Sequence, residues 1–570
     1  MSLTGALNAA VASLRVNQAS IQVLSANIAH VNDPNYTRKT LSREAMTLGE
    51  NQVGSVAIGS YSSAVSESLR KQMEALIASN GASGAQNDYM SRVQQLLGTS
   101  TDQAALPNLL SQFTTAWQTL QATPESTAAQ TAVIRYGEQL TEEINRVAAG
   151  IDAIDSEARD DIGQSVDKLN GLLEQVFELN VRLRSTSEDG AMRTDLVDQR
   201  DALVRDIAQY VDVRTVEREN GAIALFTPAG LSLVDGPPSK FVYDGTNVYR
   251  SEDPTTPVDS LLREGKIRAL LDFRLDNSGK SVAVSSDPST EVVRKIRSQL
   301  DAVVKAMTST TGSTFSSAYD AAGQSLRIEA AFQTTVEAQP ASPQYSTVSL
   351  SGDLRPGDVF EVEINGRIFS YTATATDATL DGIAAKLSAL INGDTTLGVT
   401  AIAGASALQL VGTTNNIPFS IKTRANGDLP ELRSGFFTGT DRFTFQVNQA
   451  LLDGTQQLKR NAASDVVTAL NSTDRTFVSA GLTMSGVSYK GMMVGLVGTS
   501  IANAKSIADE AKFNAESLTQ TEQRYQADVG VNLDEEIANL QVLQNAYSAS
   551  ARLLTVVQEL FDTLQAAVSR

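Results

Sequence analysis

The sequence predicts a multidomain α+β protein with a helical coiled-coil core built from both chain termini, a helical rod domain and an inserted β-rich outer lobe. Three patterns predict this: heptad-spaced apolar residues at both ends, long stretches of helical period, and period-two segments with turn residues in mid-chain. The 570 residues suggest about three or four domains. The expected units are 1–60 with 515–570 (terminal core), 61–210 with 255–319 and 441–514 (rod), 211–254 (small β element) and 320–440 (outer lobe).

Apolar residues recur near both ends with alternating spacings of four and three, which is the seam of a coiled-coil helix. A lone amphipathic helix leaves one apolar face in water, so we expect the first helix to pack against the last. The N-terminal ladder is Leu3, Leu7, Ala10, Leu14, Asn17, Ile21, Leu24, Ile28 and Val31, and the C-terminal ladder is Leu540, Leu543, Tyr547, Ser550, Leu554, Val557, Phe561, Leu564 and Val568.

The C-terminal helix carries a second seam beside the first. Two adjacent seams bury more surface than one partner helix covers, so we expect contact with neighbouring subunits. A helix bundle within one chain is the alternative. Because both ends then need partners, residues 1–50 and 520–570 are expected to be mobile or loosely paired in the isolated monomer. The second seam is Val542, Ala546, Ala549, Leu553, Val556, Leu560 and Ala567.

The middle of the chain reads as helices after a break at Asp33-Pro34-Asn35, where proline disfavours a helix in the preceding residue. Period-two alternation begins at Val211, with turn signals at Asn220-Gly221 and Asp235-Gly236. The predicted helices cover 62–97, 102–121, 125–186, 194–209 and 291–307.

Residues 320–440 read as a separate lobe. Strands flank the hairpin turn Asn365-Gly366, and Thr379 can cap a helix that Asn392-Gly393 ends. Further strands are expected at 398–403, 407–411 and 417–422. From residue 442 onwards we expect helix to the end of the chain.

Composition excludes several classes of function. The formal charge of −19 disfavours a nucleic-acid partner, which would require a basic surface. With no cysteine, the chain forms no disulfide and has no thiolate site. Residues 1–30 lack the features of a cleaved secretory signal, and no apolar stretch is long enough to span a bilayer, so we expect no membrane insertion and, if the protein is exported, another export signal.

No catalytic, cofactor-binding or metal-binding residues are expected. His30 is the only histidine and lies at the end of the first ladder, where a polar helix-end residue is the simplest interpretation. The carboxylates of Asp534, Glu535 and Glu536 could in principle act as a glycosidase pair, but they begin a helix, where its dipole favours acids. The sequence contains neither the phosphate-binding motif G-x-x-x-x-G-K-[ST] nor a G-x-G-x-x-G motif that follows a strand.

Four segments carry a resemblance to a known family. Residues 27–38, N-I-A-H-V-N-D-P-N-Y-T-R, resemble the N-terminal signature of bacterial flagellar axial proteins, usually close to N-I-A-N-V-N-T-P-G-Y-T-R. The closing motifs G-V-N-L-D-E-E at 530–536 and E-L-F-D-T-L at 559–564, together with D-L-V-D-Q-R-D-A-L at 195–203, are similar to the hook–filament junction members of that family. His30, Asp33 and Asn35 depart from the signature, and Asn35 tolerates the positive φ of the usual glycine.

The resemblance implies a structural protein rather than an enzyme. It implies export through the flagellar type III apparatus and self-assembly into a ring on the extracellular flagellum, with hook protein on one side and a second junction protein and the filament on the other. It also implies an export chaperone on the C-terminal helix. Within the family the alternative is a hook or distal-rod protein; an adhesin or a wall hydrolase on a flagellar scaffold is a more distant one.

The expected assembly interface combines the terminal ladders, the second seam and the signature loop. Its residues are Leu3, Leu7, Leu14, Ile21, Leu24, Ile28, Asn32, Pro34, Tyr36, Leu540, Leu543, Tyr547, Leu553, Leu554, Val557, Leu560, Phe561 and Leu564.

Overall fold

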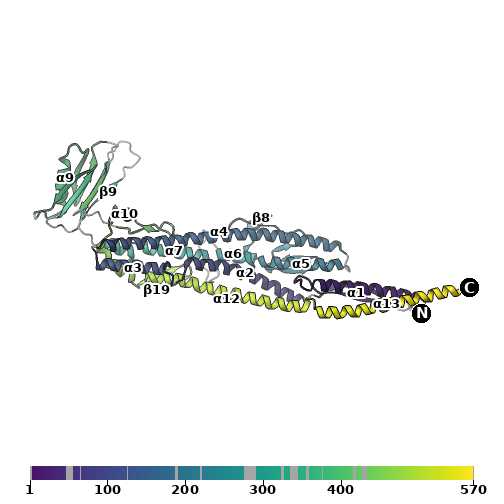
Figure 1. Cartoon of the computed structure of the whole chain (residues 1–570). Coiled ribbons are helices and arrows are strands. Elements are labelled where there is room, and N and C mark those ends of the chain that lie inside the picture. The colour runs from purple at the N-terminus through teal and green to yellow at the C-terminus, as the bar shows by residue number, and fades with distance from the viewer. Residues whose placement is uncertain are drawn as a thin grey trace.

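The chain forms an elongated rod with the two termini paired at one end and a β-rich lobe at the other (Figure 1). This α+β architecture confirms the predicted fold class. The computed structural model describes residues 3–46, 55–64, 66–99, 101–124, 126–186, 191–218, 221–274, 290–322, 327–333, 344–352, 354, 358–374, 376–414, 419–425, 432 and 434–568.

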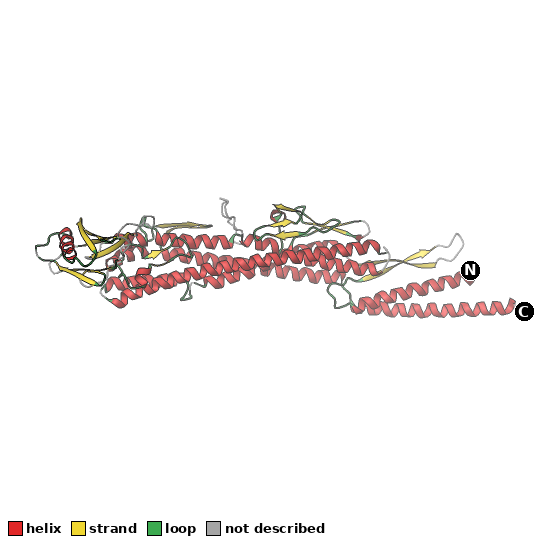
Figure 2. Cartoon of the chain, turned by 90° about the horizontal axis from the view of Figure 1, so that it is seen from above, coloured by secondary structure: helices red, strands yellow, loops and turns green. Residues whose placement is uncertain are grey.

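Long helices run side by side along the rod and form its body (Figure 2). Helix α2 packs on α12, and α3 packs on α4. The apolar positions predicted on the long fourth helix, such as Val133, Ile144 and Val176, are fully buried in the body core. The body helices are α2 (Glu67–Leu97), α3 (Leu106–Ala122), α4 (Thr127–Ser185), α5 (Ala191–Tyr210), α6 (Lys266–Arg274), α7 (Val292–Thr308), α8 (Phe315–Ala321), α10 (Gln449–Leu452), α11 (Ala463–Asn471) and α12 (Tyr489–Val529).

Two small antiparallel sheets lie along α4. Asn170 and Asn180 of α4 each clamp one sheet, because each side-chain amide donates to a strand carbonyl and accepts from the same residue's backbone N–H, on Phe241 and Ile223 respectively. The first sheet is β3 (Arg214–Glu217), β4 (Ile223–Phe226) and β5 (Ser232–Val234), and the second is β6 (Phe241–Tyr243), β7 (Val248–Arg250) and β8 (Asp253–Pro257).

The outer lobe has its own apolar core, separate from that of the body. The turn Asn365-Gly366 has positive φ at both residues and joins two paired strands, as predicted. Thr379 caps the lobe helix by accepting from the Gly382 N–H at 3.3 Å. The lobe consists of β9 (Arg327–Gln333), β10 (Tyr345–Ser351), β11 (Val359–Ile364), β12 (Arg367–Thr372), α9 (Leu380–Asn392), β13 (Val399–Gly404), β14 (Ala407–Gly412) and β15 (Ile421–Ala425), in sheets of order β13-β14-β10-β9 and β12-β11-β15.

The lobe joins the body at a cluster of seven aromatic rings. Trp117, the only tryptophan, is fully buried there. Tyr319, Phe436 and Phe437 belong to this cluster and to the core of the body. The expected lobe, 320–440, takes in part of that core, because Ala322, Phe436 and Phe437 lie within it. The apolar core of the lobe itself spans only 348–425. The remaining cluster members are Phe113, Phe315 and Phe445.

Three hairpins were not expected from the sequence. The strands β1 (Lys39–Met46) and β2 (Ser55–Ser63) pair and contact the first helix. The pairs β16 (Phe437–Thr438) with β17 (Gln446–Val447), and β18 (Arg475–Ser479) with β19 (Leu482–Val487), interrupt the region after 442, so the prediction of continuous helix there is wrong. Strands β16 and β17 are short, and strands β18 and β19 are largely exposed. Both features weaken the apolar alternation that marks a strand in a sequence.

Candidate functional site: the terminal helix pair and its joint

The first and last helices lie side by side and extend beyond the body (Figures 1 and 2). They are α1 (Leu3–Ala29) and α13 (Leu533–Val568), and they contact each other along their length. Midway, the hydroxyls of Ser13 and Ser550 lie 3.3 Å apart. The predicted pairing of the first helix with the last is therefore present within one chain.

The first ladder of α13 faces α1. Leu543 and Val557 are buried, and Leu540, Leu554 and Phe561 are half-buried. Tyr547 and Leu564, assigned to the same ladder, are exposed at 37% and 57%. The ladder thus predicts the inward face of α13 at most of its positions, with Tyr547 and Leu564 as the exceptions.

On α1 the most buried face coincides only in part with the predicted ladder. The expected residues Leu7, Leu14, Ile21, Leu24 and Ile28 are only half-buried, and the side chain of Leu3 lies outside the described residues. The physical reason is that α1 has two neighbours, α13 and the unexpected hairpin β1–β2, so the line between them is covered best. The buried residues of α1 are Ala10, Val16, Asn17, Ala19, Ser20, Val23 and Asn27, of which Ala10 and Asn17 belong to the predicted ladder.

The second seam of α13 is exposed in the single chain. Its side chains Val542, Leu553, Val556 and Leu560 are between 50% and 65% exposed, on a helix whose other apolar face is covered. Aligned aliphatic side chains left in water are unfavourable and indicate a binding surface.

A polar network, which we call the joint, connects α1, α13 and the body. The joint consists of Asn27, Tyr36, Thr37, Arg38, Lys39, Asp195, Asp198, Glu535 and Glu536. At its centre the Asn27 side chain is 1% exposed. Its amide donates to the Lys39 carbonyl and to Glu536 Oε2, both at 3.0 Å, and it accepts from the Tyr36 hydroxyl at 2.9 Å and the Lys39 N–H at 3.1 Å. All four of its hydrogen-bonding positions are therefore used.

Arg38 fastens the first turn of α13. Its Nε donates to Glu536 Oε1 at 2.7 Å and its Nη2 to Glu535 Oε1 at 2.8 Å, while its backbone N–H donates to the carbonyl of Val529 at the end of α12. Glu536 is 1% exposed, so this is a charge-assisted pair inside the fold. The pair holds the chain where α12 turns into α13.

The other side of the joint binds α5. Buried Lys39 pairs with Asp195 and lies 3.6 Å from Asp198, and the Thr37 hydroxyl donates to Asp198 at 2.6 Å. Burial raises the pKa of Asp198 above its ordinary value, although Thr37 and Lys39 oppose this shift. Burial likewise lowers the pKa of Lys39, against the attraction of Asp198. Because the two ions compensate each other, they can remain charged in a buried place.

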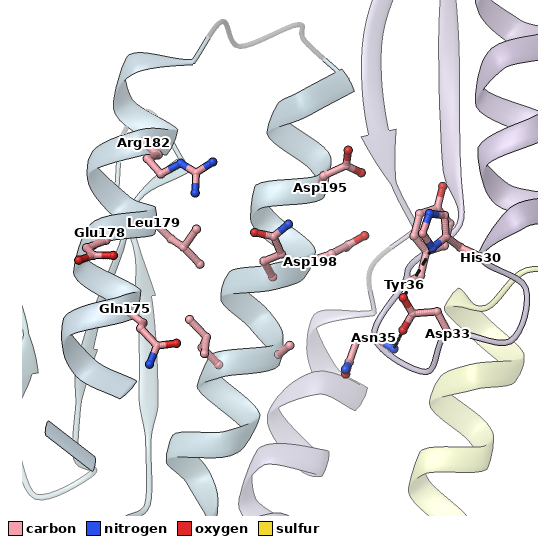
Figure 3. Close-up of a pocket in the computed structure, with 13 residues that line it drawn as sticks. His30, Asp33, Asn35, Tyr36, Gln175, Glu178, Leu179, Arg182, Asp195 and Asp198 are labelled. Atoms are coloured by element: carbon pink, nitrogen blue, oxygen red, sulfur yellow. Dashed lines mark hydrogen bonds and ion pairs between the residues drawn. The ribbon is translucent and has the colours of Figure 1, made fainter. Parts of the chain in front are cut away.

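The signature loop lies beside an open pocket between the joint and helices α4 and α5 (Figure 3). The pocket has a volume of about 620 Å³ and is lined by His30, Asp33 and Tyr36 on one side and by Glu178 and Arg182 on the other. Asn32 and Pro34 of the loop are exposed, whereas Tyr36, expected at an interface, is buried within its own chain. His30 stacks on Tyr36 with ring centroids 4.7 Å apart, consistent with a helix-end role.

The joint contains residues whose role the sequence did not reveal. The sequence favours Glu535 and Glu536 as charges at a helix start, and the structure shows that they also bind an arginine about 500 positions away. The signal was the co-occurrence of two motifs: residues 27–38 and 530–536 are two halves of one network, and the motif at 195–203 supplies its contact with the body. Among the residues that the structure describes, no cluster of acidic or histidine side chains could hold a metal ion.

Comparisons with known proteins find similar flagellar proteins. The helical domain of the flagellar hook-associated protein FlgK matches residues 90–327, and the C-terminal domain of the flagellar basal body rod proteins FlgEFG matches residues 522–567. Flagellar hook-associated protein 1 of Salmonella typhimurium is 26% identical over 592 residues, covering 99% of both chains, and that of Escherichia coli strain K12 is 26% identical over 589 residues with the same coverage. The flagellar hook junction protein FlgK from Burkholderia pseudomallei has a solved structure that covers 80% of this chain and 99% of its own, with a TM-score of 0.46 at 14% identity.

The matched domains and the relatives make the chain a structural component of the bacterial flagellum. Over 99% of its length the chain is similar to flagellar hook-associated protein 1. In the described parts of the chain, none of the helices is both long and apolar enough to cross a membrane.

Proposed function

We propose that the chain assembles with copies of itself into a ring at the hook–filament junction. The exposed second seam of α13 carries this proposal, because the fold leaves it without a partner. Neighbouring copies would bury it in the inner part of the ring, with the body as a supporting layer and the lobe directed outward. The similarity to a structural flagellar protein supports a role without catalysis.

The half-buried ladder of α1 and the exposed second seam of α13 match each other in length. The half-buried ladder of α1 runs from Leu7 to Ile28, 21 positions, and the second seam with Leu564 runs from Val542 over 22 positions. At a rise of 1.5 Å per residue both stripes are about 32 Å long. Packing the stripe of one copy on the different stripe of the next is a heterologous contact, and such contacts close into rings when the rotation allows it.

The proposed partners follow from the same surface. Before assembly the exposed seam would invite aggregation, so an export chaperone is proposed to cover α13. The chain would leave the cell through the flagellar type III apparatus and be extracellular in its assembled state. It would then contact hook protein on one side and a second junction protein and the filament on the other.

A hook or distal-rod protein is the second candidate, because residues 522–567 match a rod-protein domain. Similarity to hook-associated protein 1 over 99% of the chain favours the junction. Expressing the chain in strains that lack either the junction protein or the hook protein would separate the two. Filaments restored only in the first strain support the junction, and hooks restored in the second would refute it.

Substitutions on α13 test the assembly surface. Leu554→Asp places a carboxylate against α1, and Leu553→Asp places one on the exposed seam. A buried unpaired carboxylate costs several kcal/mol, whereas an exposed surface change usually costs within about 0.5 kcal/mol. Both variants should give hooks without stable filaments and release unpolymerised filament protein, as seen by electron microscopy of cells and blotting of the medium.

Gln565→Asp is the matched control, since Gln565 is exposed and belongs to neither seam. It should build normal filaments, and a blot should show all three variants exported. Normal filaments from both leucine variants would disprove assembly through the two seams.

A further inference from the structure

Helix α12 carries the most exposed aromatic ring among the described residues. Phe513 is 67% exposed and lies in a stretch of α12, 508–520, in which no side chain is buried. This stretch is fixed to α2 by Asn514, whose amide donates to the Ser79 carbonyl at 3.4 Å and to the Ser83 hydroxyl at 3.0 Å. Aromatic side chains are the usual anchors of protein interfaces, so Phe513 is a candidate anchor.

Acidic side chains surround this ring. Asp509 and Glu510 lie four and three positions before Phe513, and Glu516 lies three positions after it, so all three are its neighbours on the helix surface. Asp509 and Glu516 pair with lysines of the same helix at 3.0 and 3.8 Å, which leaves Glu510 as the excess charge. We call Phe513 and these three acids the aromatic patch.

A second surface, where α4 ends and α5 begins, carries apolar and basic side chains. Val181 is 44% exposed and Met192 is 66% exposed. Arg182 and Arg184, in the last turn of α4, are exposed and have no ion-pair partner among the described residues. The loop 187–190, which contains two acidic residues, lies outside the described residues. We call the four named side chains the basic corner.

We propose that the aromatic patch of one copy packs on the basic corner of the next copy. This contact rests on the proposed assembly of the chain with itself. The seams would join copies beyond the body, and the new contact would fix the bodies to each other. Phe513 would lie against Val181 and Met192, whose thioether interacts favourably with aromatic rings. The two arginines would lie over the ring and reach Glu510.

Charge favours this mixed pairing over contacts between two identical surfaces. Two aromatic patches that face each other would bring Glu510 of both copies together, and two basic corners would bring four arginines together. Like charges across an interface repel, whereas the mixed pairing joins opposite charges. It also leaves each copy with one patch and one corner for its two neighbours, so the contact repeats from copy to copy.

The two surfaces lie at different heights on the rod. Phe513 precedes Val529, whose carbonyl binds the joint, by about 24 Å of helix. The basic corner lies beside the joint, since Arg182 lines the same pocket as Tyr36 (Figure 3). The contact would therefore displace each copy along the rod relative to its neighbour, so that the ring is stepped like one turn of a helix.

The absence of cysteine from the chain allows site-specific cross-linking. Phe513→Cys is combined with Met192→Cys or with Val181→Cys, and each double variant replaces the natural chain in flagellated cells. A short bismaleimide, which tolerates more separation than a disulfide, is then added to isolated flagella. At least one pair should give a ladder of covalent oligomers on a denaturing gel, because the contact repeats. Each single variant should give monomers.

Val494→Cys with Met192→Cys is the matched control, because Val494 is also exposed on α12 but lies 19 positions from Phe513. It should give no ladder. Filaments are scored by electron microscopy before cross-linking. Filaments without a ladder from either test pair would overturn this contact and leave assembly through the seams standing. Dimers from Phe513→Cys alone, or a ladder from the control pair, would also overturn it.

An exchange of charges tests the same contact if the cysteine at position 513 prevents filaments. Glu510→Arg and Arg184→Glu should each reduce the swarm diameter of cells at least about twofold, and the two together should restore it. Glu522→Arg, at another exposed acid of α12, should leave swarming unchanged. A blot should show that all variants are exported. Normal swarming of both single variants, or a double variant no better than either, would refute the contact.

Discussion

At the scale of single residues, Glu74 of α2 is the most unusual charge. It is 3% exposed and lies 3.9 Å from Arg70, which is equally buried, and its Oε1 has no hydrogen-bond partner in the structure. Burial raises the pKa of Glu74 to about 7, against the attraction of Arg70. The other charged or titratable groups around it are Lys71 on α2, Asp201 and Arg205 on α5, Glu217 beside Arg70, and Tyr525 on α12.

This shift predicts a pH dependence of stability. The folded chain binds this proton up to about pH 7, whereas the unfolded chain releases it near pH 4.5. The protonated Glu74 therefore contributes to the free energy of unfolding by about 3 kcal/mol below pH 4.5. This contribution is lost as pH rises to about 7. Glu74→Gln should raise the thermal midpoint of unfolding at pH 8 and change it little at pH 5.

Trp117 emission can follow this unfolding because the tryptophan is buried in the body. Glu67→Gln is the control, since Glu67 lies two turns earlier on α2 in an exposed pair with Lys71. Such exposed pairs contribute little to stability. A benefit of Glu74→Gln that is the same at both pH values would contradict the assigned titration.

At the scale of elements, the turn before α6 fastens the small β region to α5. Gly265 has φ of +95°, and a Cβ there would lie 2.5 Å from the Tyr210 carbonyl oxygen. Gly245 has the same φ of +95° with open space around it. Gly245→Ala should cost about 1–2 kcal/mol from the left-handed backbone alone. Gly265→Ala should cost clearly more, because backbone must also move.

Denaturant unfolding of the two glycine variants measures this difference. Both carry the same backbone strain, so the gap between them isolates the steric contact at Tyr210. Equal losses of stability would show that the turn can shift at no cost.

The elements also show what the sequence could predict. The long body helices could be predicted because their apolar residues keep the 3.6-residue period over many turns. Ile144 and Leu173, two of these residues, are fully buried. The hairpin β1–β2 was missed because most of its described side chains are exposed or half-buried, and its strands show no clear apolar alternation. Because it was missed, the buried face of α1 was predicted only in part. The joint was missed because hydrogen bonds between distant segments leave no periodic signal.

At the scale of the whole molecule, the lobe and the body should separate cleanly only if the cut respects the aromatic cluster. Deleting residues 327–425 and closing the chain with a short flexible linker removes the strands and the apolar core of the lobe. The body should then keep its Trp117 emission and thermal midpoint. Deleting 320–440 also removes Phe436 and Phe437 from the body core and should lower stability by several kcal/mol.

Motility and export of the two deletion strains complete this test. The shorter deletion should preserve filaments if the lobe is dispensable for assembly. Loss of filaments with export and body stability intact would show that the lobe takes part in assembly.

Helix α4 gives the molecule a mechanical property. With 59 residues at 1.5 Å each it is about 88 Å long. Near its start, Gly137 lies against the ring of Phe436 at the base of the lobe, and near its end, Arg182 lines the pocket beside the joint. A force applied to the lobe would therefore be transmitted along one uninterrupted hydrogen-bonded helix to the end of the body that lies beside the joint.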